Sequence, residues 1–461
     1  MTLIKSISGI RGTIGNEKGD HLTPEDVVKF TSAYAMWLKR HTNKERGRVV
    51  VGRDARLSGS MVYHLVCGTL LAMGFDVVNL QMATTPTVEI AVMGEKADGG
   101  IILTASHNPV QWNALKLLNE KGEFLNKAEG EEVLHIAEHE KIIYSEVHAL
   151  GKETVRTDYL DHHIRRILDL PEVDTEAIAS AGFRVVVDGI NSVGGIAIPR
   201  LLEALAVEQV IPVNCEPTGD FAHNPEPLPA HLTGICEAIV QHKADLGFVV
   251  DPDVDRLAIV NEDGSMFGEE YTLVAVADYV LQQRPGNTVS NLSSTKALKE
   301  LTERLGGSYY PSAVGEVNVV EKMKEKQAVI GGEGNGGVIL PALHYGRDAL
   351  AGVALFLSHL ARSGKSCSGL RKQYPAYHIS KNKIQLTPDI NVDLILERLK
   401  QEFQDFPIND IDGVKIHFQQ GWVHLRKSNT EPIIRVYSEA EDESSAEALA
   451  QRIIRAADEI T

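Results

Sequence analysis

Residues 100–109 read Gly-Ile-Ile-Leu-Thr-Ala-Ser-His-Asn-Pro, an apolar run that stops at a polar loop. The run 100–103 predicts a short buried strand, and Asn108-Pro109 predicts the turn that closes the loop behind it. Ser106 is therefore expected at the end of a strand, where α/β proteins tend to place their functional groups. By itself, a serine in such a loop is commonly a turn residue that hydrogen-bonds its own backbone.

Similar apolar runs recur at residues 48–51, 184–187, 247–250 and 328–330, and each leads into a turn rich in glycine or aspartate. We expect a helix after each of these turns, except after the glycine-rich turn at residues 331–337. Continuous apolar strands that alternate with helices are typical of sheets covered on both faces. The predicted fold class is therefore α/β. A chain of 461 residues suggests about three domains, and joints are expected near residues 150–156, 251–262 and 364–375.

The C-terminal part of the chain has a different pattern. Strands are expected over residues 414–418, 422–425 and 433–437, and a closing helix follows them. Ser444 and Glu447 have the spacing of a capping box at the start of that helix. Its apolar stripe comprises Leu449, Ile453, Ala457 and Ile460. This pattern predicts a small α+β domain.

Composition narrows the classes of partner. The chain is 43% hydrophobic, has a formal net charge of −17 and contains no basic run, so a nucleic-acid partner is not expected. It shows neither an N-terminal apolar segment nor a stretch long enough to cross a membrane, so no membrane association is expected. The four cysteines are far apart and form no C-x-x-C pair. They are interpreted as reduced thiols in a cytoplasmic protein.

His107, next to Ser106, suggests a hydrolase pair. Adjacent residues in an extended segment point to opposite sides, however. No G-x-S-x-G elbow surrounds Ser106 either. A hydrolase triad is therefore not predicted.

Residues 251–256 read Asp-Pro-Asp-Val-Asp-Arg and follow one of the predicted strands. In an extended chain this spacing places Asp251, Asp253 and Asp255 on one side, where their mutual repulsion favours a bound cation. Hard oxygen ligands suit Mg²⁺, with a phosphate oxygen completing the shell. An EF-hand begins with the same D-x-D-x-D pattern, but its sixth position needs glycine where this chain has Arg256. We therefore predict a metal loop that is not an EF-hand.

Two further loops offer polar groups. Residues 331–337, Gly-Gly-Glu-Gly-Asn-Gly-Gly, formally satisfy G-x-G-x-x-G, but no helix is expected after them, so a dinucleotide site is not predicted. Their Glu333 and Asn335 suit sugar hydroxyls better. Residues 426–432, Arg-Lys-Ser-Asn-Thr-Glu-Pro, together with Arg435 have the guanidinium, hydroxyl and backbone groups that hold phosphate. Either loop could also be a solvent-exposed turn without a ligand.

The four loops resemble, in order, the phosphoserine, metal, sugar and phosphate loops of the α-D-phosphohexomutases, which move phosphate between C1 and C6 of a sugar. T-A-S-H-N-P and D-P-D-x-D-R are highly specific, and residues 8–12 resemble the G-I-R-G signature of that family. The resemblance spans residues 8–437. It implies three similar α/β domains with mixed sheets and a C-terminal α+β lid domain around a central cleft. The implied domains are 1–153 with the phosphoserine, 154–252 ending in the metal loop, 253–371 with the sugar loop, and 372–461 with the phosphate loop.

By position, the resemblance makes Ser106 the carrier of the phosphoryl group. It implies one Mg²⁺ per chain, held by Asp251, Asp253 and Asp255 together with Ser106. Lys116 would be the proton shuttle, provided that nearby cations lower its pKa. The other implied catalytic residues are His107, Arg11 and Arg256. The implied sugar-binding residues are Glu333 and Asn335, and the implied phosphate-binding residues are Arg426, Ser428, Asn429, Thr430 and Arg435.

The resemblance further implies a mutase that works through a phosphoserine enzyme and a bisphosphorylated sugar, with a hexose or glucosamine 1,6-bisphosphate as activator. The sugar loop departs from the common G-E-M-S-G-H and G-E-Q-S-G-H forms, because Asn335 replaces serine and Gly337 replaces histidine. His344 and Arg347 are candidates for the role of that histidine. Residues 313–319 look more like the glucosamine branch of the family. Glucosamine 6-phosphate and glucosamine 1-phosphate are therefore the expected substrates, with glucose or mannose phosphates as the alternative.

Two rival functions share some of these residues. A metal-dependent phosphatase would use Ser106 and the three aspartates but would not need a phosphate cradle at residues 426–435. A non-catalytic sugar-phosphate sensor would be expected to lose Ser106, Lys116 or a metal aspartate, and all are present. The mutase is therefore favoured over both. Glucosamine members of the family are often homodimers, but the sequence shows no interface signature.

Overall fold

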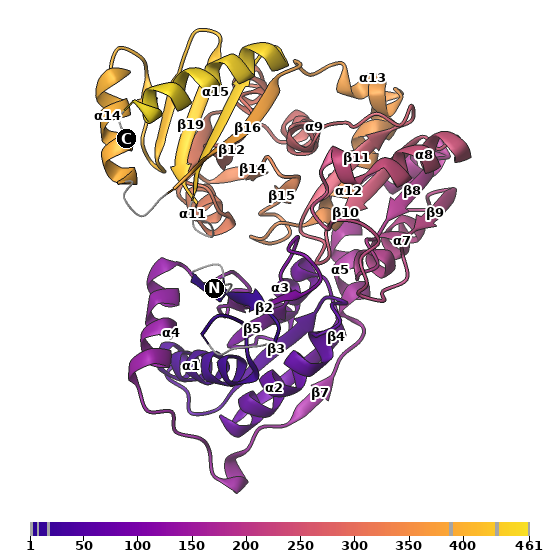
Figure 1. The fold of residues 1–461 in the computed structure, drawn as a ribbon. Helices are drawn as coiled ribbons and strands as arrows, with labels where there is room; N and C mark the ends of the chain where they lie inside the picture. The colour runs from indigo at the N-terminus through magenta and orange to yellow at the C-terminus, as the bar shows by residue number, and fades with distance from the viewer. Residues whose placement is uncertain (1–2, 7–8, 16–18, 387–390, 429–432, 460–461) are drawn as a thin grey trace. The chain divides into compact units, whose positions relative to one another are not determined.

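The computed structural model describes residues 3–6, 9–15, 19–386, 391–428 and 433–459 (Figure 1). The chain forms two compact units. The first contains Met1–Tyr279 and Asn335–Ser368, and the second contains Val280–Gly334 and Gly369–Thr461. None of the helices in the described ranges combines the length and apolar character that a membrane-spanning helix needs.

The first unit begins with a seven-stranded mixed sheet. Its strands are β1 (Ile4–Ser6), β2 (Gly9–Thr13), β3 (Gly47–Arg53), β4 (Phe75–Met82), β5 (Gly99–Leu103), β6 (Trp112–Leu118) and β7 (Glu153–Val155). They lie in the order β1-β2-β6-β5-β3-β4-β7. β5, β3, β4 and β7 run parallel, and β6, β2 and β1 continue the sheet from β5 through antiparallel pairings. The accompanying helices are α1 (Pro24–Thr42), α2 (Gly59–Ala72), α3 (Thr85–Gly94), α4 (Lys127–His139) and the short η1 (Val147–Ala149).

Both faces of this sheet are covered, which explains the unbroken apolar run at residues 48–51. Val49 and Val51 of β3 pack in the cluster that contains side chains of α1, α2 and α4. Val50 points to the other face and packs with side chains of α3. The functional loops follow the carboxyl ends of β3 and β5, as expected for an open α/β sheet.

A second sheet has the order β11-β10-β8-β9. Its strands are β8 (Arg184–Asp188), β9 (Gln209–Val213), β10 (Leu246–Val250) and β11 (Leu257–Asn261), and the helices around it are α5 (Tyr159–Leu168), α6 (Thr175–Ala181), α7 (Gly194–Ala204), α8 (Thr233–His242) and the short η2 (Pro229–His231). The prediction of a helix after residues 247–250 is wrong, because the strand β11 follows there and pairs antiparallel with β10. Residues 257–261, Leu-Ala-Ile-Val-Asn, are apolar and suit a buried strand. The predicted boundary at 252/253 therefore lies within a hairpin.

The rest of the first unit attaches to the metal loop. It comprises the part of α9 (Glu269–Gln283) up to residue 279, β15 (Gly337–Ile339), α12 (Ala349–Ser363) and the start of α13 (Cys367–Arg371). β15 is the segment that follows the glycine-rich residues 331–336, where a strand and not a helix stands, as expected. Leu257 N donates to Gly336 O at 3.1 Å, and Ala349 N donates to Val254 O at 3.2 Å. Both ends of the 336–349 segment are thus hydrogen-bonded to the hairpin that carries the aspartates.

The second unit contains a parallel sheet segment and an antiparallel sheet. β12 (Asn287–Asn291) lies between β13 (Tyr309–Ser312) and β14 (Ala328–Glu333), with α10 (Ala297–Arg304) and α11 (Glu316–Lys326) beside them. The antiparallel sheet has the order β16-β20-β19-β18-β17. It is built from β16 (His378–Gln385), β17 (Ile408–Asn409), β18 (Val414–His417), β19 (Gly421–Lys427) and β20 (Ile433–Ala440), with α14 (Val392–Glu402) and α15 (Glu443–Asp458). The predicted C-terminal α+β region is confirmed, and with it the α/β fold class of the rest.

The predicted capping box of α15 is wrong. The N-cap residue is Asp442, whose side chain accepts a hydrogen bond from Ser445 N at 2.8 Å. Glu447 instead accepts hydrogen bonds from β16, including one from Asn382 Nδ2 at 3.0 Å. Aspartate caps a helix as well as serine does, so the sequence offered two equally good starts two residues apart. The stripe formed by Leu449, Ile453 and Ala457 is buried as expected, and Ile460 lies outside the described residues.

Candidate active site

Ser106 sits in a left-handed backbone conformation directly after β5. Its φ is 48°, its N–H donates to Thr104 Oγ1 at 2.9 Å, and the residue is 7% exposed. The hydroxyl donates to Asp251 Oδ2 at 2.8 Å and lies 3.3 Å from His107 Nδ1. The expectation that Ser106 and His107 point to opposite sides is therefore wrong, because the loop turns at Ser106 instead of continuing extended. The arrangement still gives no hydrolase triad, since the carboxylate hydrogen-bonds the serine itself and not the histidine.

A buried arginine holds this loop. Arg56 is 1% exposed, and its Nε donates to Asp54 Oδ2 at 3.0 Å. Its two terminal nitrogens donate to four backbone carbonyls of the loop, those of Ser106 at 2.6 Å, Asn108 at 2.6 Å, Pro109 at 2.7 Å and Trp112 at 2.9 Å. A left-handed non-glycine residue costs about 1–2 kcal/mol, and this fork of donors supplies the fixed partners that stabilise it. Sequence reasoning missed Arg56, because nothing local distinguishes a buried arginine from the exposed ones.

The three aspartates of the metal loop come together as predicted. All three are completely buried, and one carboxylate oxygen of each lies within 4.8 Å of the others. The cause is a turn and not an extended chain. Val254 N donates to Asp251 O at 3.0 Å, and Val254 has a φ of 63°. Asp251 Oδ1 then accepts the N–H groups of Asp255 and Arg256, each at 3.1 Å.

Neighbouring side chains engage one oxygen of Asp253 and one of Asp255. Thr85 Oγ1 donates to Asp253 Oδ2 at 2.6 Å, and Lys116 Nζ lies 2.7 Å from the same oxygen. Arg347 donates to Asp255 Oδ2 at 2.6 Å. In the described part of the chain, Oδ1 of Asp253 and Oδ1 of Asp255 are buried without a hydrogen-bond partner. Buried carboxylate oxygens left in this way fit a hard divalent cation such as Mg²⁺.

Charges within the cluster shift the pKa values of Asp251 and Asp255 in opposite directions. Burial and repulsion from Asp255 and Asp253 raise the pKa of Asp251 well above its usual range. Burial alone would also raise the pKa of Asp255, but Arg347, Lys116 and Arg256 lower it overall. For Lys116, burial lowers the pKa, yet Asp253 and Asp255 raise it above the ordinary value. The expectation that cations depress the pKa of Lys116 is therefore wrong, because its nearest charged neighbours are carboxylates.

The remaining predicted catalytic residues gather a local positive charge. Burial and the neighbouring Arg256 and Arg11 hold the pKa of His107 well below its usual range. Burial and Arg256 likewise lower the pKa of Arg11. Arg11 and Arg256 are thus close enough to repel each other and to disfavour a protonated His107, in a chain whose net charge is −17. Such a cluster suits an anionic group that restores the balance.

The sugar loop and the 313–319 segment meet in the second unit. Glu333, at the end of β14, is 4% exposed and accepts hydrogen bonds from Asn291 Nδ2 at 2.8 Å and from Gly315 N at 3.1 Å. Two stretches that the sequence singled out separately are therefore joined through one carboxylate. Asn335 belongs to the first unit, where its Oδ1 accepts from Gly337 N at 3.2 Å.

The structure also separates the two candidates for the missing loop histidine. A Cβ added to Gly337 would lie 2.4 Å from Cδ of Arg347, so the glycine leaves the space that the Arg347 stem occupies. His344 is instead buried beside Asp348, at 3.1 Å from its Oδ2. Arg347 is thus the residue that fills the position beside the loop.

The described part of the phosphate loop lies on β19 and β20. Arg426 and Arg435 are directly opposite across these antiparallel strands. Burial lowers the pKa of Arg426, while Asp412, Tyr437 and Glu333 act in the opposite direction. Ser428 is buried, and its N–H donates to Ile433 O at 2.9 Å. Asn429 and Thr430 lie outside the described residues.

A buried histidine connects the phosphate strand to the sugar segment. His424 Nε2 donates to Asp412 O at 2.7 Å, and His424 Nδ1 lies 3.0 Å from Ser293 Oγ. The side chain of Asp412 in turn accepts from Val314 N at 3.0 Å. Burial is the main cause that lowers the pKa of His424 to about 3.

A serine hydrogen-bonded to a buried aspartate triad, with arginines beside it, is typical of enzymes that transfer phosphoryl groups. Together with the α/β fold, these groups define the class of protein as a phosphoryl-transfer enzyme. Sequence profiles of four domains of the phosphoglucomutase/phosphomannomutase family match the chain. Alpha/beta/alpha domain I matches residues 3–142, domain II 157–264, domain III 268–377 and the C-terminal domain 384–456. The chain belongs to this family, which confirms the resemblance to α-D-phosphohexomutases, and it is an intramolecular phosphotransferase.

Individual relatives match over nearly their whole length. A phosphoglucomutase/phosphomannomutase of Thermococcus kodakarensis is 37% identical over 95% of this chain and 94% of its own. A phosphoglucosamine/phosphogalactosamine mutase of Sulfurisphaera tokodaii is 30% identical over 96% of this chain and 97% of its own. The crystal structure of a phosphoglucomutase/phosphomannomutase family protein from Burkholderia thailandensis is similar with a TM-score of 0.85 and 25% identity, covering 99% of this chain and 97% of that one.

Replacing Arg56 with methionine is expected to destabilise the first unit by about 3–5 kcal/mol, because the buried Asp54 carboxylate loses its cation. Urea unfolding monitored by circular dichroism measures the change. Arg48→Met is the matched control, since Arg48 lies on β3, just before the Arg56 turn, but pairs with Glu95 at the surface; about 1 kcal/mol or less is expected there. The double variant Asp54→Asn/Arg56→Met should recover part of the loss. Equal effects of Arg56→Met and Arg48→Met would contradict the proposed clamp.

The stability of the second unit should fall as the pH drops below about 6.5. The unfolded chain protonates His424 near that pH, whereas the folded chain does so only near 3. The unfolded state therefore binds more protons between these values, and each pH unit costs about 1.4 kcal/mol. Urea midpoints measured from pH 7 to pH 4 for wild type and His424→Gln test this. The variant should show a shallower pH dependence, and parallel curves would rule out His424 as the cause.

Proposed function

We propose that the chain interconverts glucosamine 6-phosphate and glucosamine 1-phosphate through a phosphoserine at Ser106 and a bisphosphorylated sugar. The observation that carries the proposal is the contact of Ser106 Oγ with Asp251 at 2.8 Å, in a loop that Arg56 fixes. A hydroxyl at the edge of a buried carboxylate triad is suited to share a cation with those carboxylates once it is phosphorylated. Asp251, Asp253 and Asp255 would hold one Mg²⁺, which neutralises charge on the phosphoryl group in transit.

In this proposal, the phosphoryl group leaves Ser106 Oγ for a sugar hydroxyl, and the second phosphate of the resulting bisphosphate later returns to Ser106. Each transfer breaks one P–O bond and forms another, so one proton must leave the attacking hydroxyl and one must reach the departing oxygen. Lys116 is the proposed carrier. Because Asp253 and Asp255 keep it as an ammonium, it begins by giving a proton to the departing oxygen and is restored by the attacking one.

Cations on this chain would stabilise the anionic phosphoryl group throughout. Arg11 and Arg256 form the positive cluster that an incoming phosphate would relieve of its internal repulsion, and His107, whose pKa both arginines lower, is the third proposed catalytic residue beside them. Glu333 and Asn335 are proposed to recognise sugar hydroxyls. The phosphate that is not reacting would be held by Arg426, Ser428, Asn429, Thr430 and Arg435. A sugar 1,6-bisphosphate activator, a cytoplasmic location and a homodimer belong to the same proposal.

The substrate assignment depends on the second unit. Residues 313–319 are held by Glu333 through Gly315 N, so the segment that resembles the glucosamine branch contacts the proposed sugar loop directly. The Sulfurisphaera relative is named for amino-sugar phosphates. The Thermococcus relative, which is more similar in sequence, is named for glucose and mannose phosphates, and this favours phosphoglucomutase/phosphomannomutase activity as the second candidate.

Ser106→Ala should lower mutase activity by at least about a thousandfold, because the residue that carries the phosphoryl group is gone. Intact-protein mass spectrometry after incubation with a sugar bisphosphate should find one phosphoryl group on wild type and none on the variant. Ser60→Ala, at an exposed position of α2, is the control and should match wild type in both measurements. Phosphorylation that persists in Ser106→Ala would contradict the assignment. Release of inorganic phosphate without isomerisation would favour a phosphatase.

Values of kcat/KM test the substrate assignment. They are measured for glucosamine 1-phosphate, glucose 1-phosphate and mannose 1-phosphate, each with Mg²⁺ and the matching bisphosphate. A preference for glucosamine of tenfold or more is expected, which is about 1.4 kcal/mol in the transition state. Equal or faster turnover of glucose or mannose phosphates would support the second candidate and leave the phosphoserine mechanism standing.

A further inference from the structure

A second cluster of metal-ligating side chains lies in the first unit, separate from the aspartate triad. It consists of His163 on α5, His344, and Asp348 at the N-cap of α12. One ligand atom of each lies within 4.8 Å of the others, and the three residues are 0%, 5% and 1% exposed. Asp348 Oδ2 is 2.8 Å from His163 Nε2 and 3.1 Å from His344 Nε2. Two imidazoles and a carboxylate therefore converge on one buried point.

Outer contacts fix each of these groups from behind. His163 Nδ1 lies 3.0 Å from Thr87 Oγ1, and His344 Nδ1 lies 3.1 Å from Glu89 Oε2. Asp348 Oδ1 accepts the N–H groups that begin α12. Metal-binding histidines characteristically have their second ring nitrogen on an oxygen, which fixes the tautomer and turns the other nitrogen toward the metal. His163 has this oxygen in a hydrogen bond, and His344 has it in an ion-pair contact.

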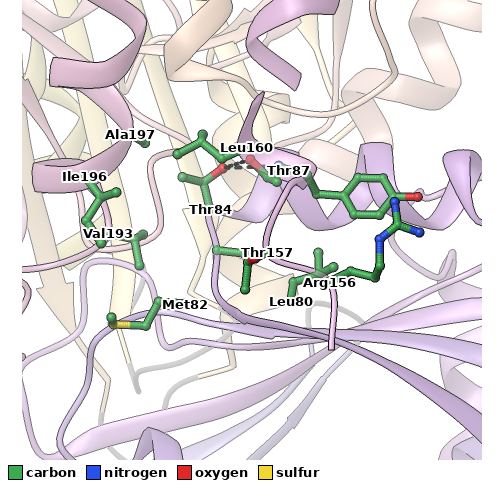
Figure 2. A pocket seen from close by; sticks show the side chains of 12 residues that line it. Leu80, Met82, Thr84, Thr87, Arg156, Thr157, Leu160, Val193, Ile196 and Ala197 are labelled. Carbon is green, nitrogen blue, oxygen red and sulfur yellow. Dashed lines mark hydrogen bonds between the residues drawn. The ribbon is translucent and has the colours of Figure 1, made fainter. Parts of the chain in front are cut away.

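The cluster lies between two cavities of the first unit. On the Thr87 side, Figure 2 shows Thr87 hydrogen-bonded to Thr84 on the wall of a cavity of about 40 Å³. On the other side, His344 lines a more open cavity of about 780 Å³ together with Leu343 and Tyr345. His344 therefore borders a cavity from which an ion can arrive, and an entry path is one requirement of a metal site.

The two carboxylates at the cluster, Asp348 and Glu89, need two positive charges to balance them. Asp348 and Glu89 are both almost completely buried carboxylates. Burial lowers the pKa of His344, but Asp348 and Glu89 raise it to about 9 overall. Two protonated imidazoles or one divalent cation with neutral imidazoles would balance the carboxylates. A buried charge without such a balance is strongly unfavourable.

We propose that His163, His344 and Asp348 bind a divalent transition-metal ion of the zinc type, with Glu89 as the outer carboxylate. A ligand set of two imidazoles and one carboxylate suits zinc or cobalt, whereas the all-carboxylate triad suits magnesium. His163 lies far from the 344–348 segment in the chain, so the ion would cross-link these two parts of the first unit. Arg347, which donates to Asp255, lies between two residues of the proposed site. Binding there would therefore fix the segment that reaches the metal loop.

The first test uses tag-free wild-type protein that has been stripped with chelator and titrated with Co²⁺ in excess Mg²⁺. The proposal predicts visible absorption bands of nitrogen-coordinated cobalt that saturate at one equivalent per chain, and their loss when Zn²⁺ is added. Absence of these bands would overturn it and show that protons neutralise Asp348 and Glu89. This measurement needs no variant and no mutase activity.

Variants then locate the ion. Metal analysis after dialysis against Zn²⁺ should find one equivalent fewer in His344→Gln than in wild type. If His344→Gln does not fold, His163→Asn takes its place and should show the same loss. His139→Gln is the matched control, because His135 and His139 form an exposed pair on α4 that could hold zinc adventitiously. Equal zinc content in His344→Gln and wild type, or loss only in His139→Gln, would overturn the proposal. Asp253→Asn should lower mutase activity but keep the cobalt bands, so that failure of the proposed function and failure of this site are distinguishable.

Discussion

Three carboxylates buried within 4.8 Å of one another impose the main constraint on this molecule. Their desolvation and repulsion are unfavourable unless positive charge is brought to them. Lys116, Arg347 and Arg256 supply part of that charge, each from a different segment of the first unit. The cluster could in addition hold a metal ion, because Oδ1 of Asp253 and Oδ1 of Asp255 are buried without a hydrogen-bond partner among the described residues. An acidic chain thus places its cations where its own carboxylates need them.

The same constraint explains the form of the Ser106 loop. A hydroxyl can approach Asp251 only if the chain turns sharply after β5, and Ser106 does so in a left-handed conformation. Backbone carbonyls are exposed by such a turn and must be satisfied in a buried environment. Arg56 meets them with its two terminal nitrogens and is itself neutralised by Asp54. Positioning of the Ser106 hydroxyl therefore depends on Arg56, which contacts the backbone of the loop and not the hydroxyl.

Much of this could be predicted from the sequence, and the failures have physical causes. The apolar runs predicted the main strands, and the spacing of the aspartates predicted that their carboxylates come together, because these signals are local. The conformation at Ser106, the capping residue of α15 and the raised pKa of Lys116 could not be predicted. Each depends on groups brought close by tertiary structure or on a choice between equally good local signals. Arg56 and Thr85 were missed for the same reason, since their partners lie far away in the chain.

Arg347 lies in the short segment that connects the aspartate triad with the cluster of His163, His344 and Asp348. Its guanidinium pairs with Asp255, while its neighbour Asp348 accepts hydrogen bonds from two histidines and caps α12. The lack of a side chain at Gly337 leaves the space through which the arginine passes. One short segment, hydrogen-bonded to the aspartate hairpin at Gly336 and Ala349, therefore carries groups that belong to both clusters. The two clusters are joined through this backbone and share no side chain.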